Sequence, residues 1–533
     1  MIALQDLKQK ELIKRRLHRA DRVDFIEVDT WISASTMLRV LAECKTDILF
    51  VSLTRTICKL EPKSIEKFVE VAEIYQAGIV YSDYRQTVGL RVIEHPTASY
   101  QEGCIRDTFD LGSLVLLSIR AATEALKRYG APSTDLRWLG FYDLRLKLSI
   151  DHELIRIAEP LYSTGALPGR RSRSETLDIS NTFYAVDKSD RQYQIEAENI
   201  ATAHLHRIGA YLPSGIAPPP PCSSELEFKV TASVIIPVYN REKTLTDAIE
   251  SAINQVTSFL YNIIIVDDYS TDSTAEIIRH FCSQKKNIVH IIPERKDLGI
   301  GGLWNEAIYS SECGLYALQL DSDDVFAHDH AIDLMVKEFT RNRSDGGMNV
   351  RAPLYGMVLG SFTCVDEDLN EIPPGLDQRL QLSRENLRNN LLCIEGPSAP
   401  RAFYVPVLRK IGFPNVSFGE DYAIALRIAR EYDVGRVFES TYLARHWRDN
   451  TTRTLPYGGL KGNRIKNVFP SGINRKEFLS HIQPITESLE ILSSFQCNSY
   501  KDHVRTVEIQ ARKTMNQRLT MDGELPFRFS PSK

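Results

Sequence analysis

The sequence predicts an α/β protein of more than one domain, built on mixed sheets and followed by a helical tail. Three observations favour this class. Short apolar runs alternate with helical patterns in both halves of the chain. A proline-rich stretch separates the halves, and the apolar run Ala317–Leu320 ends in the carboxylates of Asp321, Asp323 and Asp324. Because open α/β sheets bind ligands at the carboxyl ends of their strands, we expect the chemistry at this acidic turn.

Composition excludes several functional classes. The 533 residues are enough for two or three domains, and the net charge of −4 argues against a general nucleic-acid binder. No apolar run approaches the roughly 20 residues of a membrane helix, and the charged N-terminal stretch is unlike a signal peptide. We therefore expect no transmembrane segment, and leave peripheral membrane association and homo-oligomerisation open. Nine cysteines without a Cys-x-x-Cys pair predict neither a disulfide framework nor a zinc site, which favours the cytoplasm.

The N-terminal half begins with a basic helix expected over residues 1–20 and continues in a βαβ rhythm. Long helices are expected over Leu114–Tyr129 and Lys188–Tyr211. The clearest boundary is Pro213–Ser224, because a proline run is stiff, extended and unable to join the interior of a sheet. We therefore predict an N-terminal helix at 1–22, a first α/β domain at 23–187, a helix and proline-rich linker at 188–230, a second α/β domain at 231–468 and a helical tail at 469–533, with helices at Ile485–Phe495 and Lys501–Arg518.

Two βα units are expected ahead of the acidic turn. Parallel strands end at the same edge of a sheet, so Asn240, Asp268 and the acidic turn should lie together there. The expected strands are Thr231–Asn240, Tyr261–Val266 and Asn287–Ile292, and the expected helices are Glu242–Val256 and Ser273–Ser283.

The acidic turn itself suits a hard divalent cation. Asp321 and Asp323 lie on the same side of an extended chain, and clustered carboxylates favour Mg²⁺ or Mn²⁺. An acidic turn is also common on protein surfaces, so the motif alone does not establish a metal site. A calcium loop is excluded because Phe326 stands where glycine is needed and Ile332 where glutamate is needed.

Taken in order, the motifs of the second half resemble inverting glycosyltransferases of family 2, which have the GT-A fold. The resemblance implies a metal-dependent transfer of a sugar from a nucleotide-sugar donor, such as a UDP-sugar, to the hydroxyl of a glycan or other acceptor. Polysaccharide or glycoconjugate biosynthesis is the implied context. The matching segments are Val234–Asn240, Val266–Asp272, Asn305, Leu320–Asp324, Gly419–Asp421 with Arg427, and Tyr442–Asn450.

The resemblance also implies a metal site. Asp321, Asp323 and Asp324 would hold Mn²⁺ or Mg²⁺, which neutralises the departing diphosphate, with Asp321 shared with the ribose. His446 would be a further metal or phosphate contact, although its spacing to Asn450 is one residue longer than the usual pattern.

Nucleotide contacts are implied at the ends of the first two strands. Asp268 would bind the uracil base, and its neighbour Asp267 stays open as an alternative. The first loop over the base would be formed by Pro237, Val238 and Tyr239, with Tyr239 available for stacking.

Further contacts to the donor are implied by Asn305 and Arg427. The family commonly has an arginine before the helix asparagine, whereas this chain has Trp304, so Arg295 or Lys296 would supply the phosphate contact instead. Trp304 also stands at the third glycine position after Gly299-Ile-Gly, so the dinucleotide fingerprint is absent.

The resemblance makes Asp421 the general base for the acceptor hydroxyl, with Glu420 as the alternative. A carboxylate suits the N-terminus of the helix expected at Asp421–Glu431, because the helix dipole stabilises negative charge there. Cys393–Pro400 lies where the family's acceptor loop usually falls.

The first half resembles a degraded copy of the same plan. Ile48–Arg55 aligns with Ala317–Asp324, but Ser52, Thr54 and Arg55 replace the three aspartates, and a cation would be repelled by the arginine. We therefore expect residues 23–187 to form a degenerate GT-A-like domain without transferase activity. The same alignment pairs Gly140–Asp143 with Gly419–Asp421 and Tyr162 with Tyr442.

A second functional hypothesis is a glycan- or nucleotide-binding protein without catalysis, built on a transferase scaffold. The presence of Asp421 beside the donor-site aspartates disfavours it, since binding alone requires no base.

Overall fold

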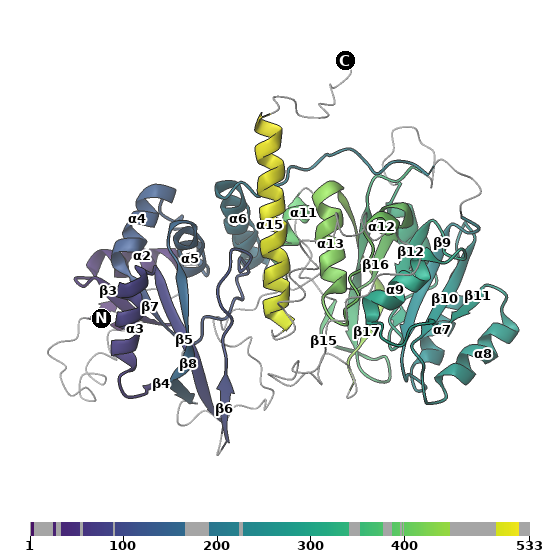
Figure 1. The fold of residues 1–533 in the computed structure, drawn as a ribbon, viewed down its shortest axis with the longest axis horizontal. Coiled ribbons are helices and arrows are strands. Elements are labelled where there is room, and N and C mark those ends of the chain that lie inside the picture. Colours follow the sequence, from purple (N-terminus) through teal and green to yellow (C-terminus); the bar gives the residue numbers. More distant parts are fainter. Residues whose placement is uncertain are drawn as a thin grey trace. The chain divides into compact units, whose positions relative to one another are not determined.

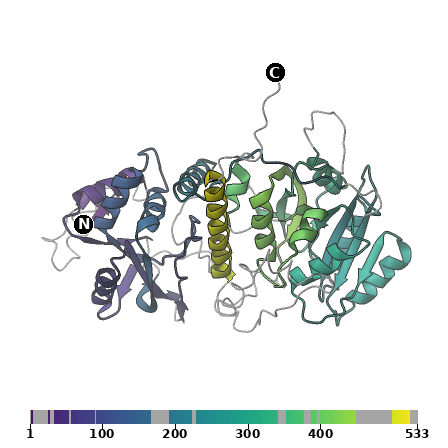
Figure 2. The same ribbon diagram turned by 45° about the horizontal axis from the view of Figure 1, so that its top comes forward.

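The structure, a computed structural model, describes residues 2–4, 25–27, 33–53, 57–88, 91–165, 191–222, 228–340, 352–376, 386–394, 397 and 399–447, and the helix at 497–521. The chain divides into two compact units, Met1–Gly209 (unit 1) and Ala210–Lys533 (unit 2). Each unit contains its own sheet with helices packed against it (Figures 1 and 2). This mixed α/β architecture with a C-terminal helix confirms the predicted fold class.

Unit 2 contains a nine-stranded sheet in the order β11-β10-β9-β12-β16-β14-β17-β13, with β15 paired to β14. Strands β11, β10, β9 and β12 are parallel, so their carboxyl ends share one edge. The strands are β9 (Ala232–Val238), β10 (Tyr261–Asp267), β11 (Ile288–Ile291), β12 (Tyr316–Gln319), β13 (Val325–Phe326), β14 (Met357–Val365), β15 (Glu371–Leu376), β16 (Arg401–Tyr404) and β17 (Val434–Arg445).

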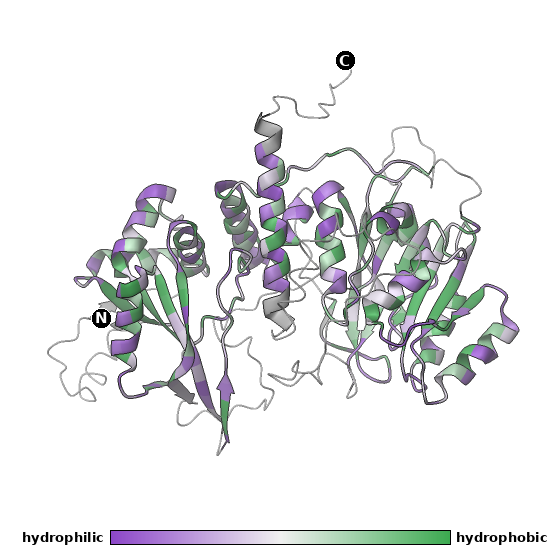
Figure 3. Cartoon of the chain, in the orientation of Figure 1, coloured by the Kyte–Doolittle hydropathy of each residue, from purple (hydrophilic) through white to green (hydrophobic). Residues whose placement is uncertain are grey.

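The helices of unit 2 cover a sheet whose central strands are mainly apolar. Figure 3 shows these strands as hydrophobic ribbons beside amphipathic helices, and residues 234–236 of β9 are buried, as parallel strands covered on both faces require. The helices are α7 (Leu245–Ile253), α8 (Thr274–Gln284), α9 (Ile300–Tyr309), α10 (Ala331–Glu338), α11 (Leu387–Asn390), α12 (Val405–Ile411), α13 (Glu420–Glu431) and α15 (Cys497–Met521).

The predicted strands and helices before the acidic turn are present in unit 2.

The glycines that precede Trp304 have a packing function in α9. A Cβ atom on Gly301 would lie 1.9 Å from the carbonyl oxygen of Pro414, and one on Gly299 would lie 2.5 Å from the carbonyl carbon of Val416. Glycine is therefore required for the close approach of α9 to the segment before α13.

Unit 1 contains a six-stranded sheet in the order β3-β7-β5-β8-β4, with β6 paired to β5. Its core lies on both faces of this sheet, beneath the helices. The elements are α2 (Ala34–Glu43), β3 (Ile48–Ser52), β4 (Ile57–Leu60), α3 (Ser64–Tyr75), β5 (Ile79–Val88), β6 (Arg91–His95), β7 (Leu114–Ser118), α4 (Ile119–Tyr129), α5 (Gly140–Asp151), β8 (Leu154–Gly165) and α6 (Arg191–Arg207).

Two predictions for unit 1 were wrong. The helix expected over Leu114–Tyr129 is strand β7 followed by helix α4, because Leu114–Leu117 is a central strand and the Ser118 side chain caps the helix by accepting from Ala121 N–H. The helix expected at the N-terminus begins as strand β1 (Ile2–Leu4), which pairs in parallel with β2 (Phe25–Glu27). Residues 5–24 of that prediction lie outside the described residues.

The proline-rich stretch, where described, belongs to unit 2. The carbonyl oxygen of Pro220 accepts a hydrogen bond from the Tyr404 hydroxyl at 3.0 Å. Of the predicted tail, Lys501–Arg518 lies within helix α15, whereas Ile485–Phe495 is outside the described residues. Every helix that the structure describes is too short or too polar to cross a membrane.

Candidate functional site

The acidic turn follows β12 at the carboxyl edge of the parallel strands, and each carboxylate has a different partner. Asp321 accepts from the Gln319 side chain at 2.9 and 3.0 Å. Asp323 accepts from the Trp447 indole N–H at 3.1 Å. Asp324 accepts from the backbone N–H of Arg445 at 2.7 Å. The turn is thus fixed against β17 and the residues that follow it.

Electrostatic strain is concentrated in this turn. Burial raises the pKa of Asp321, and burial followed by the charges of Asp321 and Asp323 raises the pKa of Asp324 well above its usual value. The Tyr442 hydroxyl lies between them, because it accepts from the backbone N–H of Asp321 at 2.9 Å and is hydrogen-bonded to the Asp324 carboxyl. A cation bound here would relieve the repulsion among these carboxylates.

The second acidic motif lies in the same electrostatic environment. Glu420 and Asp421 form the first turn of α13, and the charges of Asp321 and Asp421 act on each other. Glu420 is buried, and burial, together with the charge of Asp421, raises its pKa to about 8. Asp421 is half-buried and accepts from the backbone N–H of Tyr422 at 2.7 Å.

Arg401, the first residue of β16, joins the two motifs. Its guanidinium contacts Asp421 Oδ2 at 2.5 Å and the carbonyl oxygen of Pro397 at 2.6 Å, and its charge opposes the raised pKa of Asp321. The sequence analysis missed this residue. The available signal was an arginine opening a buried strand, since a buried charge requires a partner.

The first two strand ends form the neighbouring part of the site. Asp268 is half-buried, and burial and the charge of Asp267 raise its pKa. Asp267 is engaged by the protein: although burial would raise its pKa, hydrogen bonds from His290 and Ser270 lower it overall. Asp268 is therefore the freer carboxylate to receive a base N–H.

The first loop brings an exposed aromatic ring and a cation to this edge. Tyr239 is 53% exposed after the buried Val238 and half-buried Pro237. Arg241, which the sequence analysis also missed, lies 4.0 Å from Asp323 Oδ2 with its guanidinium 5.8 Å from the Trp447 ring.

Two predicted site residues are used elsewhere in unit 2. The Asn305 amide makes reciprocal 2.8 Å hydrogen bonds with the backbone of Phe413, which fixes α9 to the segment before α13. Arg427 forms an ion pair with Glu431, one turn further along α13. Neither is brought to the acidic turn by these contacts. Of the alternative cations, Arg295 pairs with Asp297, and Lys296 lies 4.8 Å from the centroid of the Tyr269 ring.

Within the described residues, no three His, Cys, Asp or Glu side chains are arranged as a ready metal site. His446 is exposed just after β17, and its backbone N–H donates to the carbonyl oxygen of Val365 at 2.7 Å. The oxygen donors of Asp321 and Asp323 suit a hard divalent cation, and their repulsion provides a reason to bind one. Their chemistry fits a metal, and metal binding belongs to the proposal below.

Comparison with known proteins gives the family. Residues 233–352 match the family model for glycosyl transferase family 2. The chain is 31% identical to the chondroitin synthase of Escherichia coli over 171 residues, which are 32% of this chain and 23% of that protein. It is 39% identical to a poly(ribitol-phosphate) beta-glucosyltransferase of Bacillus spizizenii over 93 residues, which are 17% of this chain and 14% of that protein. The chain therefore aligns with less than a quarter of the length of either relative.

Solved structures were also compared. Residues 1–349 of S. aureus TarS in complex with UDP-GlcNAc align with a TM-score of 0.33 and 18% identity, covering 55% of this chain and 76% of that one. The glucosyl-3-phosphoglycerate synthase of Mycobacterium tuberculosis in complex with Mg²⁺ and UDP aligns with a TM-score of 0.28 and 19% identity, covering 44% of this chain and 78% of that one. The family model is matched across the first loop and the acidic turn, so residues 233–352 of this chain form a glycosyl transferase family 2 segment.

Proposed function

We propose that this protein is an inverting, metal-dependent glycosyltransferase that moves a sugar from a UDP-sugar donor, whose base is bound by Asp268, to a hydroxyl acceptor. The observation that supports this best is the convergence of two acidic motifs about 100 residues apart in the sequence on one arginine, Arg401. The turn at Asp321–Asp324 suits the leaving diphosphate, and Glu420–Asp421 suits the acceptor hydroxyl.

Asp421 is the proposed general base. It accepts the proton of the acceptor hydroxyl while the hydroxyl oxygen bonds to the anomeric carbon, and the nucleoside diphosphate leaves with the electron pair of the broken bond. Arg401 and the Tyr422 N–H hold the Asp421 carboxylate in place. Glu420, whose pKa is about 8, keeps its proton near neutral pH and is therefore the weaker candidate.

On the donor side, Asp268 accepts a hydrogen bond from the base N–H and Tyr239 offers a ring for stacking. Asp321 and Asp323 would hold Mn²⁺ or Mg²⁺, and such an ion supplies Lewis-acid neutralisation of the leaving diphosphate. We leave Asn305 and Arg427 out of the proposed donor contacts, because their side chains are engaged by Phe413 and Glu431.

The names of the two relatives, a chondroitin synthase and a poly(ribitol-phosphate) glucosyltransferase, support a role in polysaccharide or glycoconjugate synthesis. A glycan or polyol polymer is therefore the acceptor class to test first. The cytoplasmic location stays a prediction.

The test is a donor screen with the full chain, using UDP- and GDP-linked sugars with and without Mn²⁺. Calorimetry measures binding, and release of nucleoside diphosphate measures turnover with water as acceptor. We expect metal-dependent binding of one donor, loss of binding in Asp323→Ala, and loss of turnover with retained binding in Asp421→Asn. Binding without any turnover would favour the non-catalytic nucleotide-binding scaffold, and no donor binding by the folded protein would overturn the proposed transferase and leave the glycan-binding scaffold.

A further inference from the structure

The C-terminal helix α15 packs along α13, the helix whose first turn carries Glu420 and Asp421. The two helices run side by side in Figures 1 and 2. The face of α15 toward the domain carries several charged side chains beside the apolar Val504 and Ile509. Its buried polar residues are Asp502, Arg505, Glu508 and Arg512, and both arginines are fully buried.

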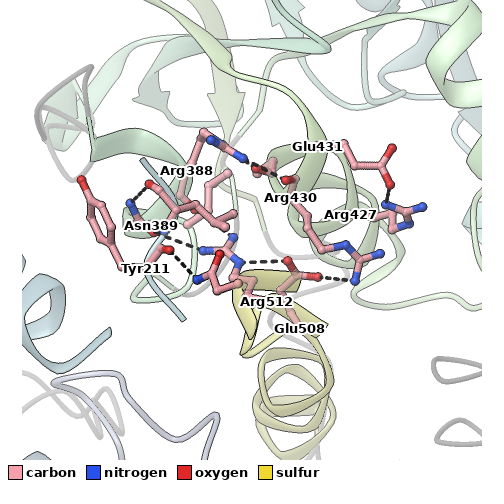
Figure 4. Close-up of polar contacts among 12 residues, drawn as sticks. Tyr211, Arg388, Asn389, Arg427, Arg430, Glu431, Glu508 and Arg512 are labelled. Atoms are coloured by element: carbon pink, nitrogen blue, oxygen red, sulfur yellow. Dashed lines mark hydrogen bonds and ion pairs between the residues drawn. The ribbon is translucent and has the colours of Figure 1, made fainter. Parts of the chain in front are cut away.

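One half of this contact holds the far end of α13 (Figure 4). Arg512 donates to Glu508 at 2.9 Å, and Glu508 in turn accepts from Arg430, in the last turn of α13, at 3.3 Å. Arg512 also donates to Asn389 Oδ1 at 3.3 Å and to the carbonyl oxygen of Arg388 at 3.2 Å. This half joins α15 to α11 and to the end of α13, far from the carboxylates.

The other half reaches the residues beside the proposed base. The Arg505 guanidinium lies 4.8 Å from the centroid of the Tyr422 ring and donates to the carbonyl oxygen of Ile394. Asp502 neutralises the arginine at 2.5 Å. Tyr422 also donates from its hydroxyl to the carbonyl oxygen of Leu391 at 2.8 Å. Arg505 and Tyr422 therefore hold the 391–394 turn together.

From Arg505, two routes lead to the Asp421 carboxylate. The first passes through Tyr422, whose backbone N–H donates to Asp421 Oδ1. The second involves Pro397, three residues after Ile394 in the sequence, whose carbonyl oxygen accepts from Arg401, the residue that contacts Asp421 Oδ2. Oδ1 of this carboxylate thus depends on a residue that contacts Arg505, and Oδ2 depends on an arginine held by a residue near Ile394 in the sequence.

Burial of so much charge is not needed to attach a helix. A buried ion pair contributes little net stability compared with apolar residues of the same volume, whereas it fixes geometry through directed hydrogen bonds. Resting on the proposed function, we propose that Arg505 is a positioning residue for the catalytic base, so that helix α15 sets the orientation of Asp421 and of the 391–394 turn on the acceptor side.

The experiment compares Arg505→Met with the matched variant Arg512→Met, which also removes a fully buried arginine from α15. Donor hydrolysis by the full chain gives turnover, UDP titration with Mn²⁺ gives donor Kd, and thermal melting gives stability. We expect both variants to melt at lower temperature. Only Arg505→Met should lose turnover, by about 10- to 100-fold, with donor Kd unchanged, because a small displacement of a catalytic group has effects of that order. Arg505→Lys, which keeps a cation near the Tyr422 ring, should recover part of the loss.

Equal turnover losses in the two methionine variants, no loss in Arg505→Met, or a changed donor Kd in that variant would overturn the proposal. If Arg505→Met does not fold, Tyr422→Phe decides, because it keeps the ring but releases the Leu391 carbonyl. It should lower turnover at unchanged donor Kd, and unaltered turnover would overturn the proposal. Wild-type protein without turnover would instead overturn the proposed function itself.

Discussion

The sheets of the two units share one strand plan, and they differ in what stands at the strand ends. The order β3-β7-β5-β8-β4 in unit 1 corresponds to β12-β16-β14-β17-β13 in unit 2, and each neighbouring pair has the same direction in both. Even the side strands agree, since β6 pairs with β5 as β15 pairs with β14. Strands β9 and β10 extend the sheet of unit 2 beside β12, whereas the parallel pair β1 and β2 of unit 1 forms a separate two-stranded sheet. In the described residues, the six-stranded sheet of unit 1 is therefore a partial copy without strands in the places of β9, β10 and β11.

The register of the strands corrects the alignment made from sequence by one residue. In β12, Ala317 is opposite Phe403, and in β3 the equivalent residue is Leu49, opposite Leu117. Counting onward places Leu53, a buried apolar residue, at the position of Asp321. Thr54 and Arg55, which follow, lie outside the described residues.

The other proposed catalytic positions are also replaced. Tyr142 and Tyr422 are equivalent, because each donates its hydroxyl to a backbone carbonyl, at 2.6 and 2.8 Å, from the same place in its helix. Phe141 then corresponds to Asp421. By strand register Val115 corresponds to Arg401. The comparison shows that the apolar strands and the tyrosines are sufficient for the fold, whereas the carboxylates and the arginine are features of unit 2 alone.

The largest effect is expected from giving unit 2 the apolar residue of unit 1 at Arg401. Arg401→Val leaves Asp421 and Asp321 without their shared cation, so turnover should fall by about 100-fold or more. Stability should fall by about 3 kcal/mol, since one partner of a largely buried pair is removed. Denaturant unfolding and donor hydrolysis measure the two effects, and Val115→Ala is a control that should change stability alone. Retained turnover in Arg401→Val would show that unit 2 does not need the arginine that unit 1 lacks at this position.

The equivalent tyrosines Tyr162 and Tyr442 provide a second test. Tyr162 accepts from two backbone N–H groups, those of Ser113 and Leu114, at 2.6 and 3.2 Å. Each Tyr→Phe variant should lose about 1–3 kcal/mol, because it leaves buried backbone N–H groups without a partner. Only Tyr442→Phe should also weaken donor binding, since it releases the turn at Asp321. Calorimetry with UDP and Mn²⁺ distinguishes the two variants. Equal donor affinity in both would contradict the assignment of the donor site to the turn at Asp321.

A third test uses pH, because Glu420 corresponds to Gly140 and has no ionisable counterpart in unit 1. Its pKa rises from 4.5 to about 8 on folding. The folded state therefore holds a proton that the unfolded state releases, and the stabilisation is complete below pH 4.5 and lost as pH rises towards 8. The melting temperature of the wild type should fall across this range, and that of Glu420→Gln should fall less. An identical pH profile in the variant would show that Glu420 does not cause the fall in melting temperature.

The smallest effect is expected from adding carboxylates to unit 1. Leu53→Asp with Phe141→Asp, made in the inactive Asp323→Ala background, should restore neither donor binding nor turnover. In the described residues, no strand extends the six-stranded sheet of unit 1 where β9 and β10 extend that of unit 2, and a buried charge without a partner only destabilises the unit. Recovery of UDP binding by this triple variant would show that unit 1 is closer to a working site than its strands indicate.

Much of the fold could be predicted from periodicity. The apolar runs at β9, β10 and β12 are long and regular, so their positions were predicted to within two residues. The errors came where local signals were ambiguous. Leu114–Leu117 is as compatible with a buried helix as with a strand, and only its pairing with β3 and β5 decides between them.

The candidate site was predictable where its residues form local motifs. Asp321–Asp324 and Glu420–Asp421 each stand out as short clusters, and the structure brings both into one electrostatic environment. Asn305 was assigned to the donor by its motif, yet its amide is used by the backbone of Phe413. A motif specifies residue type and spacing, but it does not specify which neighbour a side chain will meet.

The sequence by itself determined the order of the strands and helices that lead to the acidic turn, the turn itself and the replacement of its carboxylates in the first half. Only the tertiary structure decided that Arg401 links the two acidic motifs and that Arg505 lies against Tyr422. Local patterns extend over a few residues, whereas these contacts join segments that are distant along the chain. Which of them meet is set by the packing of β16, α13 and α15 against one another.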